Sequence, residues 1–212
     1  MSIKIRESLA TCYRQLGEAR LGSGASGNVS LRSGDSLFIT PTGARPESLL
    51  PEQVVEMSLE GEPATGQLKP SSEWRMHAGI YAARPDAGAI VHCHSRYATT
   101  LACAHRALPA VHYMIAAAGS RQIPLAPYAT FGTAELAELA VAAMEQGRAC
   151  LLANHGQIAL GDTVDDALSL AVEVEELAAL YVGAEQLGGA QLLADHEMAL
   201  VEAAFETYGQ QS

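Results

Sequence analysis

The amino-acid sequence predicts an α/β fold, with a mixed, mainly antiparallel central sheet covered by helices on both faces. Short apolar stretches of strand length alternate with amphipathic stretches of helical period along the whole chain. The first strands come as adjacent hairpin-like pairs instead of strict βαβ units, which favours antiparallel pairing. The chain has 212 residues, 49% of them hydrophobic, and contains no charged run or Gly/Ser linker. We therefore expect a single domain over residues 1–212.

The first third of the chain is expected to form one helix and three short strands. Apolar residues at mostly helical spacing predict a helix over residues 3–21. The small-residue turn GSGASG leads into a strand around 28–32, and DSLFIT (35–40) forms a second strand that ends at the Pro/Gly turn 41–43. A further strand is expected around 54–58.

A helix is predicted to follow Pro70, which blocks any helix upstream of it. Ser71 or Ser72 is the candidate N-cap, and the helix should stop at Arg84–Pro85. Glu73 then lies in the first turn.

The remaining two thirds alternate between strands and helices. The DD-containing segment that begins at Thr163 predicts a long helix, and Thr133 and Gly147 are the expected start and stop of another. The expected elements are strands at 87–94, 149–154 and 156–161, a short strand or extended loop at 121–127, and helices at 95–105, 133–147, 163–188 and about 195–206.

Composition excludes several classes of partner. The formal net charge of −11 argues against nucleic acid, because phosphate backbones require clustered Lys and Arg. A small phosphorylated ligand remains compatible, since backbone amides at turns and helix N-termini can hold one. The N-terminus lacks the apolar region of a secretory signal, and no apolar stretch is long enough to span a bilayer. The four cysteines form no CxxC pair. We expect a cytoplasmic protein with free thiols and no membrane partner.

Two histidines close the apolar strand AIVHCH. Side chains alternate along a strand, so His92 and His94 share one side while Cys93 points away. Taken alone, this pair is more often simply hydrogen-bonded at a strand end. His155 supplies a third imidazole in the tight turn before Gly156, where glycine lets the backbone approach another element closely.

A carboxylate would complete a metal site. Glu73 is the candidate, although a carboxylate in a first helical turn is also favoured there by the helix dipole. His77 lies four residues later on the same helical face, so a Glu73–His77 pair is a competing ligand assignment. Three imidazoles and one carboxylate suit Zn²⁺, and a removable Glu would leave a position for substrate.

Three segments have the composition of phosphate-binding turns. SGASGN, TPTG and PSS offer backbone N–H groups, hydroxyls and, in the last case, a helix N-terminus. Each alone is weak evidence, because ordinary turns use the same residues. There is no GxxxxGK[ST] motif, and no GxGxxG follows a strand, so P-loop and Rossmann nucleotide sites are excluded.

Seven motifs occur in the order and spacing of a known family. The chain resembles the class II, zinc-dependent aldolases of the AraD/fuculose aldolase family from about residue 5 to Tyr208, most of all the branch that cleaves L-fuculose 1-phosphate. The resemblance implies the class II aldolase fold, an adducin-like domain and a homotetramer with sites at subunit interfaces. The motifs are GASGNVSLR, ITPTG, PSSEWRMH, VHCHS, PAVHYMIAAAG, APYATFGTAELAE and NHGQIAL.

The resemblance also implies roles for individual residues. Glu73, His92, His94 and His155 match the zinc ligands, with one Zn²⁺ per subunit, and Glu73 matches the carboxylate that leaves the metal and shuttles a proton. Tyr113 matches a proton donor that reaches a neighbouring subunit's site. Phe131 and Tyr208 are candidate contacts to the substrate tail. The positions that match phosphate-binding residues are Gly27, Asn28, Thr42, Gly43, Ser71 and Ser72.

The reaction implied is retro-aldol cleavage of a ketose 1-phosphate to dihydroxyacetone phosphate and an aldehyde such as L-lactaldehyde. The metal would polarise the substrate carbonyl and stabilise the enediolate. Alternatives are an aldolase for 5-deoxyribulose or 5-methylthioribulose 1-phosphate, or an epimerase or dehydratase of the same superfamily. A decarboxylase would carry lysine at position 73, so Glu73 favours C–C cleavage. A non-catalytic zinc scaffold predicts loss of Glu73 or of the phosphate turns, and both are present.

Overall fold

The structure, a computed structural model, describes residues 2–205, and over this range the strands form one seven-stranded sheet in the order β3-β2-β1-β4-β7-β6-β5. Neighbouring strands pair antiparallel except β5 and β6, which are parallel. The predicted mixed, mainly antiparallel sheet is confirmed. The strands are β1 (Asn28–Ser33), β2 (Ser36–Ile39), β3 (Val55–Ser58), β4 (Ala89–Cys93), β5 (Leu125–Ala126), β6 (Ala149–Leu152) and β7 (Gly156–Gly161).

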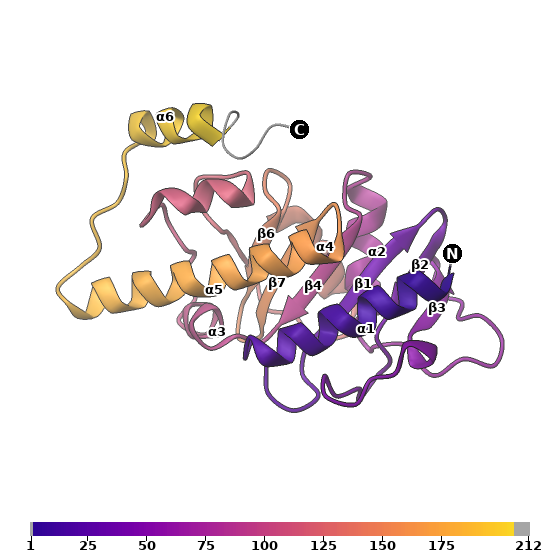
Figure 1. The fold of residues 1–212 in the computed structure, drawn as a ribbon. Coiled ribbons are helices and arrows are strands. Elements are labelled where there is room, and N and C mark those ends of the chain that lie inside the picture. The colour runs from indigo at the N-terminus through magenta and orange to yellow at the C-terminus, as the bar shows by residue number, and fades with distance from the viewer. Residues whose placement is uncertain (1, 206–212) are drawn as a thin grey trace.

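Helices cover both faces of the sheet. One face packs against α1, α3 and α5, and the other packs against α2 and α4 (Figure 1). The last helix, α6, follows an extended connection and packs beside η2. None of the described helices is both long and apolar enough to cross a membrane. The helices are α1 (Ser2–Glu18), η1 (Pro51–Gln53), α2 (Trp74–Ala83), α3 (Arg96–Cys103), η2 (Tyr113–Ala118), α4 (Ala134–Ala143), α5 (Val164–Gln186) and α6 (Asp195–Phe205).

The central strand β4 sends alternate side chains into two separate cores. Val91 and Cys93 belong to the core beneath α5, whereas Ile90 belongs to the core beneath α2. His92 has the parity of Ile90 and therefore faces α2. The strand thus separates the imidazole of His92 from the thiol of Cys93, as the alternation predicted.

The predicted start of α2 is wrong. The helix begins at Trp74 with Glu73 as its N-cap residue, and no side chain caps it. Ser71 is held in an extended segment, because its N–H donates to the carbonyl of Thr40 at 3.1 Å and Pro70 bridges Pro41. Because of this pairing with the end of β2, the helix starts only at Trp74, and Glu73 lies at its N-terminal end.

Other helix boundaries also shift. The N-cap prediction for α4 is confirmed, because Thr133 Oγ1 accepts from Leu136 N–H. Its C-terminus comes at Ala143, before the expected stop at Gly147, and α1 ends at Glu18 instead of residue 21. Thr163 and Asp166 form a reciprocal capping box at the start of α5.

Candidate metal centre and anion pocket

Four side chains from three elements converge at one end of the sheet. Glu73 comes from the N-terminus of α2, His92 and His94 from the end of β4, and His155 from the turn between β6 and β7. Their candidate ligand atoms all lie within 4.8 Å of one another. Nε2 of His92 lies 3.1 Å from Oε2 of Glu73 and 3.1 Å from Nε2 of His94, and Nε2 of His155 lies 3.3 Å from Oε1 of Glu73.

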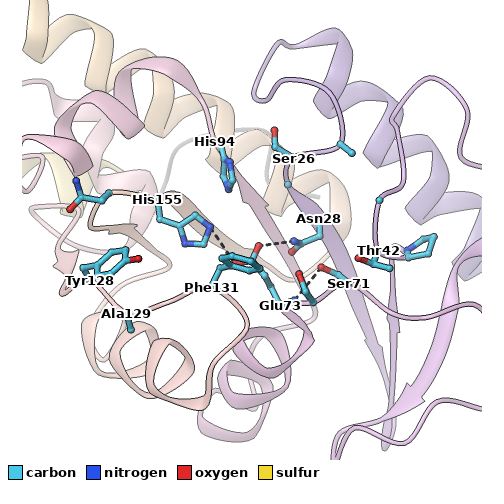
Figure 2. Close-up of a pocket in the computed structure, with 16 residues that line it drawn as sticks. Ser26, Asn28, Thr42, Ser71, Glu73, His94, Tyr128, Ala129, Phe131 and His155 are labelled. Atoms are coloured by element: carbon cyan, nitrogen blue, oxygen red, sulfur yellow. Dashed lines mark hydrogen bonds and ion pairs between the residues drawn. The ribbon is translucent and has the colours of Figure 1, made fainter.

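The three imidazoles are arranged as a propeller. Each pair of ring centroids is 4.8–4.9 Å apart, and each pair of ring planes is inclined by 70–71°. His94 and His155 turn toward the same cavity as Glu73 (Figure 2). Nitrogens that face one another at this spacing repel unless a proton or a cation lies between them.

The chemical state of these groups suits a cation. Nδ1 of His92 lies 2.8 Å from the carbonyl of Gln157 and must donate to it, which leaves Nε2 directed inward. Burial lowers the pKa of His94 and of His155 to about 4, so both are neutral at pH 7. Burial opposes protonation of His92, but the adjacent Glu73 carboxylate raises its pKa, so a metal would displace a proton there.

Glu73 is held as an anion. Burial opposes its ionisation, yet His92, His155 and a hydrogen bond from Asn28 together hold the pKa of Glu73 well below its usual range. Its Oε1 is buried and has no hydrogen-bond partner among residues 2–205. A buried carboxylate oxygen that lacks a hydrogen bond and lies beside converging imidazole nitrogens fits a bound cation, and this N₃O donor set is one that Zn²⁺ accepts. These four residues can hold a metal ion.

Two glycines allow the backbone to bring these elements together. A Cβ on Gly156 would lie 2.4 Å from the carbonyl oxygen of Cys93 and 2.9 Å from Cδ2 of His94. A Cβ on Gly27, whose φ is 85°, would lie 2.8 Å from the carbonyl oxygen of His92. The close approach predicted for Gly156 is thus observed, and β4 is the element that it approaches.

A cavity of about 330 Å³ opens beside the four side chains. The structure brings the three phosphate-type turns together along one wall, and Glu73, His94 and His155 form another (Figure 2). All six predicted phosphate-binding positions line it, as does Phe131. The full lining is Ala25, Ser26, Gly27, Asn28, Pro41, Thr42, Gly43, Ser71, Ser72, Glu73, His94, Tyr128, Ala129, Phe131, Asn154 and His155.

Two sequence candidates do not line the cavity. His77 is fully buried and uses both ring nitrogens, on Asn28 Oδ1 at 2.5 Å and on Ser30 Oγ at 2.7 Å, so the competing Glu73–His77 ligand pair is wrong. Tyr113 is half exposed on η2 and is not among the described residues that line the cavity. Tyr208 lies outside the described residues.

Sequence reasoning missed some of the lining. Tyr128 and Asn154 stand at the cavity, and both lie in or beside motifs that the resemblance used, APYATFGT and NHGQIAL. Asn154 adopts a left-handed conformation with φ of 55°, which turns the chain so that His155 follows. An Asn–His–Gly run between two strands was the available signal.

The chain is similar to known proteins over most of its length. A 5-methylthioribulose-1-phosphate/5-deoxyribulose-1-phosphate aldolase of Rhodospirillum rubrum is 49% identical, over 98% of this chain and 93% of its own. An L-fuculose phosphate aldolase of Escherichia coli is 44% identical, over 96% and 94%. The solved structure of an L-fuculose 1-phosphate aldolase superposes with a TM-score of 0.92 at 40% identity, covering 96% of each chain.

The family assignment rests on most of the chain. Residues 7–182 match the family described as class II aldolase and adducin N-terminal domain. The two relatives are named as aldolases, and the alignment with this chain covers nearly the whole length of each. Class II aldolases depend on a metal ion, and this chain has a group of one Glu and three His that can hold one. The chain therefore belongs to the class II aldolase and adducin family, and it is an aldehyde-lyase.

Proposed function

We propose that this enzyme cleaves a ketose 1-phosphate by a Zn²⁺-dependent retro-aldol reaction, releasing dihydroxyacetone phosphate and a short aldehyde. The observation that carries the proposal is that one cavity is lined on one side by the three phosphate-type turns and on another by members of the cluster of Glu73 with three histidines. A ketose 1-phosphate has the matching layout, with a phosphate on C1 beside a carbonyl on C2 and a hydroxyl on C3. The cavity volume of about 330 Å³ is that of a small-molecule site.

The phosphate is assigned to the three turns. Gly27 and Gly43 have φ values of 85° and 70°, a conformation in which successive backbone N–H groups can form an anion-binding nest. Thr42, Ser71 and Ser72 add hydroxyls at the same wall. This arrangement needs no lysine or arginine, which agrees with the acidic composition of the chain.

The metal is assigned to the opposite wall. His92, His94 and His155 would be the permanent ligands of one Zn²⁺ per subunit, and Glu73 the removable one. When bound, the ion supplies a Lewis acid that polarises the C2 carbonyl and stabilises the charge developed on C–C cleavage.

Proton transfer is assigned to Glu73 and Tyr113. The 4-hydroxyl loses its proton, the C3–C4 bond breaks, and its electron pair passes toward the C2 carbonyl while C4 leaves as the aldehyde. Once Glu73 has left the metal, its carboxylate takes up a proton from water and delivers it to C3 of the dihydroxyacetone phosphate half. Tyr113 of a neighbouring copy in a homotetramer passes the proton of the 4-oxygen to water, since its hydroxyl accepts that proton as it releases its own. The half-exposed position of Tyr113, away from its own cavity, supports that assignment.

Two substrate tails are candidates. The exposed rings of Tyr128 and Phe131 at the cavity favour an apolar tail, as in 5-deoxyribulose or 5-methylthioribulose 1-phosphate. The 49% identical relative carries the name of that activity. L-fuculose 1-phosphate, which adds a hydroxyl before its terminal methyl group, is the second candidate and matches the motifs and the superposed structure.

A panel of ketose 1-phosphates scored by aldehyde product tests the proposal. We expect acetaldehyde or methylthioacetaldehyde from the pentulose substrates at a higher kcat/KM than L-lactaldehyde from L-fuculose 1-phosphate. The reverse ranking would select the second tail. Epimerised or dehydrated product without any aldehyde would overturn the aldolase assignment of this site.

A further inference from the structure

A chain of buried polar side chains runs from Glu73 into the interior beneath α2. Asn28 Nδ2 lies 3.1 Å from Oε2 of Glu73, and Asn28 Oδ1 lies 2.5 Å from Nε2 of His77. On the far side of the ring, Nδ1 of His77 lies 2.7 Å from Oγ of Ser30, which lies 2.8 Å from the hydroxyl of Tyr81. All five side chains belong to buried residues. We call these five residues the relay.

The relay follows from two periodicities that meet at the sheet. Glu73, His77 and Tyr81 are spaced by four along α2 and therefore share its sheet-facing side. Asn28 and Ser30 are spaced by two along β1 and point to that side. Each member thus meets a partner on the other element.

The carboxylate of Glu73, at one end of the relay, determines which group donates in each hydrogen bond. An ionised carboxylate only accepts, so the Asn28 atom that faces Glu73 must be the NH₂ group. The other atom of that amide is then the oxygen, which also only accepts. Nε2 of His77 must therefore carry a proton and donate to it.

The same reasoning continues to Tyr81. His77 is completely buried, and burial lowers its pKa to about 3, so the ring is neutral and its Nδ1 has a lone pair. Ser30 must then donate to Nδ1, which uses its only proton. Tyr81 must in turn donate to Ser30. All donors point one way, from Tyr81 through Ser30, His77 and Asn28 to the carboxylate.

We propose that His77 is a positioning residue for Glu73: its Nε2–H holds the amide of Asn28 in the orientation that presents NH₂, and not oxygen, to the Glu73 carboxylate. The inference rests on the proposed function of Glu73 as removable metal ligand and base. Without His77 as donor, the amide can reverse and place its oxygen against the carboxylate, a repulsive contact in a buried site. Ser30 and Tyr81 act one step earlier, by fixing the tautomer of His77.

Two substitutions at His77 separate positioning from packing. Glutamine can place its amide N–H near the position of Nε2, so His77→Gln retains the hydrogen bond to Asn28 but not the one from Ser30, whereas His77→Met fills a similar volume without either. We expect His77→Met to weaken Zn²⁺ binding by roughly 10- to 100-fold, the range for groups that orient metal ligands. His77→Gln should recover most of that loss and most of kcat. Met76→Leu, a buried neighbour on α2, is the packing control.

Zn²⁺ affinity is read by competition with a chromophoric chelator, so it does not depend on turnover. Equal Zn²⁺ affinity in the wild type, His77→Met and His77→Gln proteins would overturn the positioning role. So would a loss of affinity in Met76→Leu as large as that in His77→Met. Should the wild type bind Zn²⁺ but cleave no ketose 1-phosphate, the proposed function fails while this comparison still decides the relay.

Nitrogen NMR of the zinc-loaded wild type, labelled at histidine, provides a second test, whose deciding measurement is made on the wild type. His77 is expected as the Nε2–H tautomer, and His92, which donates Nδ1–H to Gln157, as the opposite one. Tyr81→Phe should keep the metal but mix the two tautomers of His77. An Nδ1–H tautomer at His77 in the wild type would overturn the inference.

Discussion

The two faces of the sheet are built differently although they share the same strands. The face beneath α1, α3 and α5 is almost wholly apolar in the described residues, with Gln157 bonded to Ser95 and to the carbonyl of Ala171. The face beneath α2 and α4 buries a carboxylate, two imidazoles, an amide and two hydroxyls among its apolar side chains. The division passes between neighbouring residues, since Cys93 faces α5 and His92 faces α2.

This difference teaches how one small sheet supports both stability and reactivity. The 23-residue α5 lies across the strands and encloses its face. The 10-residue α2 starts at the cavity, so its N-cap residue Glu73 lies beside the three imidazoles and its later turns carry His77 and Tyr81. Each of the five relay side chains on the α2 face is hydrogen-bonded to another polar group. The thiol of Cys93 lies in the apolar core of the α5 face, and burial raises the pKa of Cys93 to about 12. Substitutions on the α2 face should therefore change Zn²⁺ affinity and kcat, whereas substitutions on the α5 face should change the free energy of unfolding.

Removal of the metal should have the largest effect, and it concerns the α2 face alone. Chelation is expected to abolish release of dihydroxyacetone phosphate, and added Zn²⁺ should restore it, because carbonyl polarisation requires the cation. Zn²⁺ should also raise Tm, since it binds the folded cluster of three imidazoles and Glu73. Full activity in chelated enzyme, or a substrate–lysine adduct trapped by borohydride, would contradict the zinc mechanism.

Glu73→Gln should have the next largest effect. The amide retains an oxygen for the metal but cannot transfer a proton, so we expect Zn²⁺ content to persist while kcat falls by roughly 10²- to 10⁴-fold. Steady-state kinetics and metal analysis of the same preparation measure both. The control is Glu60→Gln, because Glu60 is an exposed carboxylate that is not among the described residues lining the cavity. A variant with wild-type kcat would remove Glu73 from the proton-transfer role.

Leu177→Ala addresses the opposite face. Leu177 is buried in the apolar core on α5, and truncation should lower the free energy of unfolding by about 2–5 kcal/mol. Because the change leaves the α2 face intact, kcat and Zn²⁺ affinity of the folded fraction should not change. Denaturant unfolding and kinetics below the transition measure the two quantities. A loss of Zn²⁺ affinity at full folding would show that the two faces are not separable in this way.

The smallest effect is expected at Cys93, which stands between His92 and His94 in the sequence. Its side chain lies in the apolar core and faces away from the cluster, so Cys93→Ala should cost about 1 kcal/mol of stability. Zn²⁺ affinity should stay at the wild-type value. Metal titration of the variant checks this, and a large loss of affinity would mean that the thiol takes part in the metal site.

Local sequence patterns predicted the parts of the fold that depend on nearest neighbours. The side-chain alternation around Cys93, the N-cap at Thr133 and the close approach at Gly156 are each set by backbone geometry within a few residues. The start of α2 was mispredicted at Ser71 and Ser72 because the competing partner is Thr40, about thirty positions earlier in the chain. Local capping preference is worth about 1 kcal/mol, and tertiary pairing can outweigh it.

By itself, the sequence determined the class of fold, the approximate positions of the strands and helices, and the residue types available to bind a metal and a phosphate. Only the tertiary structure decided that His77 serves Asn28 and not the metal cluster, and that Tyr113 stands apart from its own cavity. Periodicity places a side chain on a face of its element but carries no information about which distant element covers that face. Asn28 is separated in the sequence from Glu73 by 45 positions and from His77 by 49 positions. These contacts could therefore be found only once the packing of α2 against β1 was known.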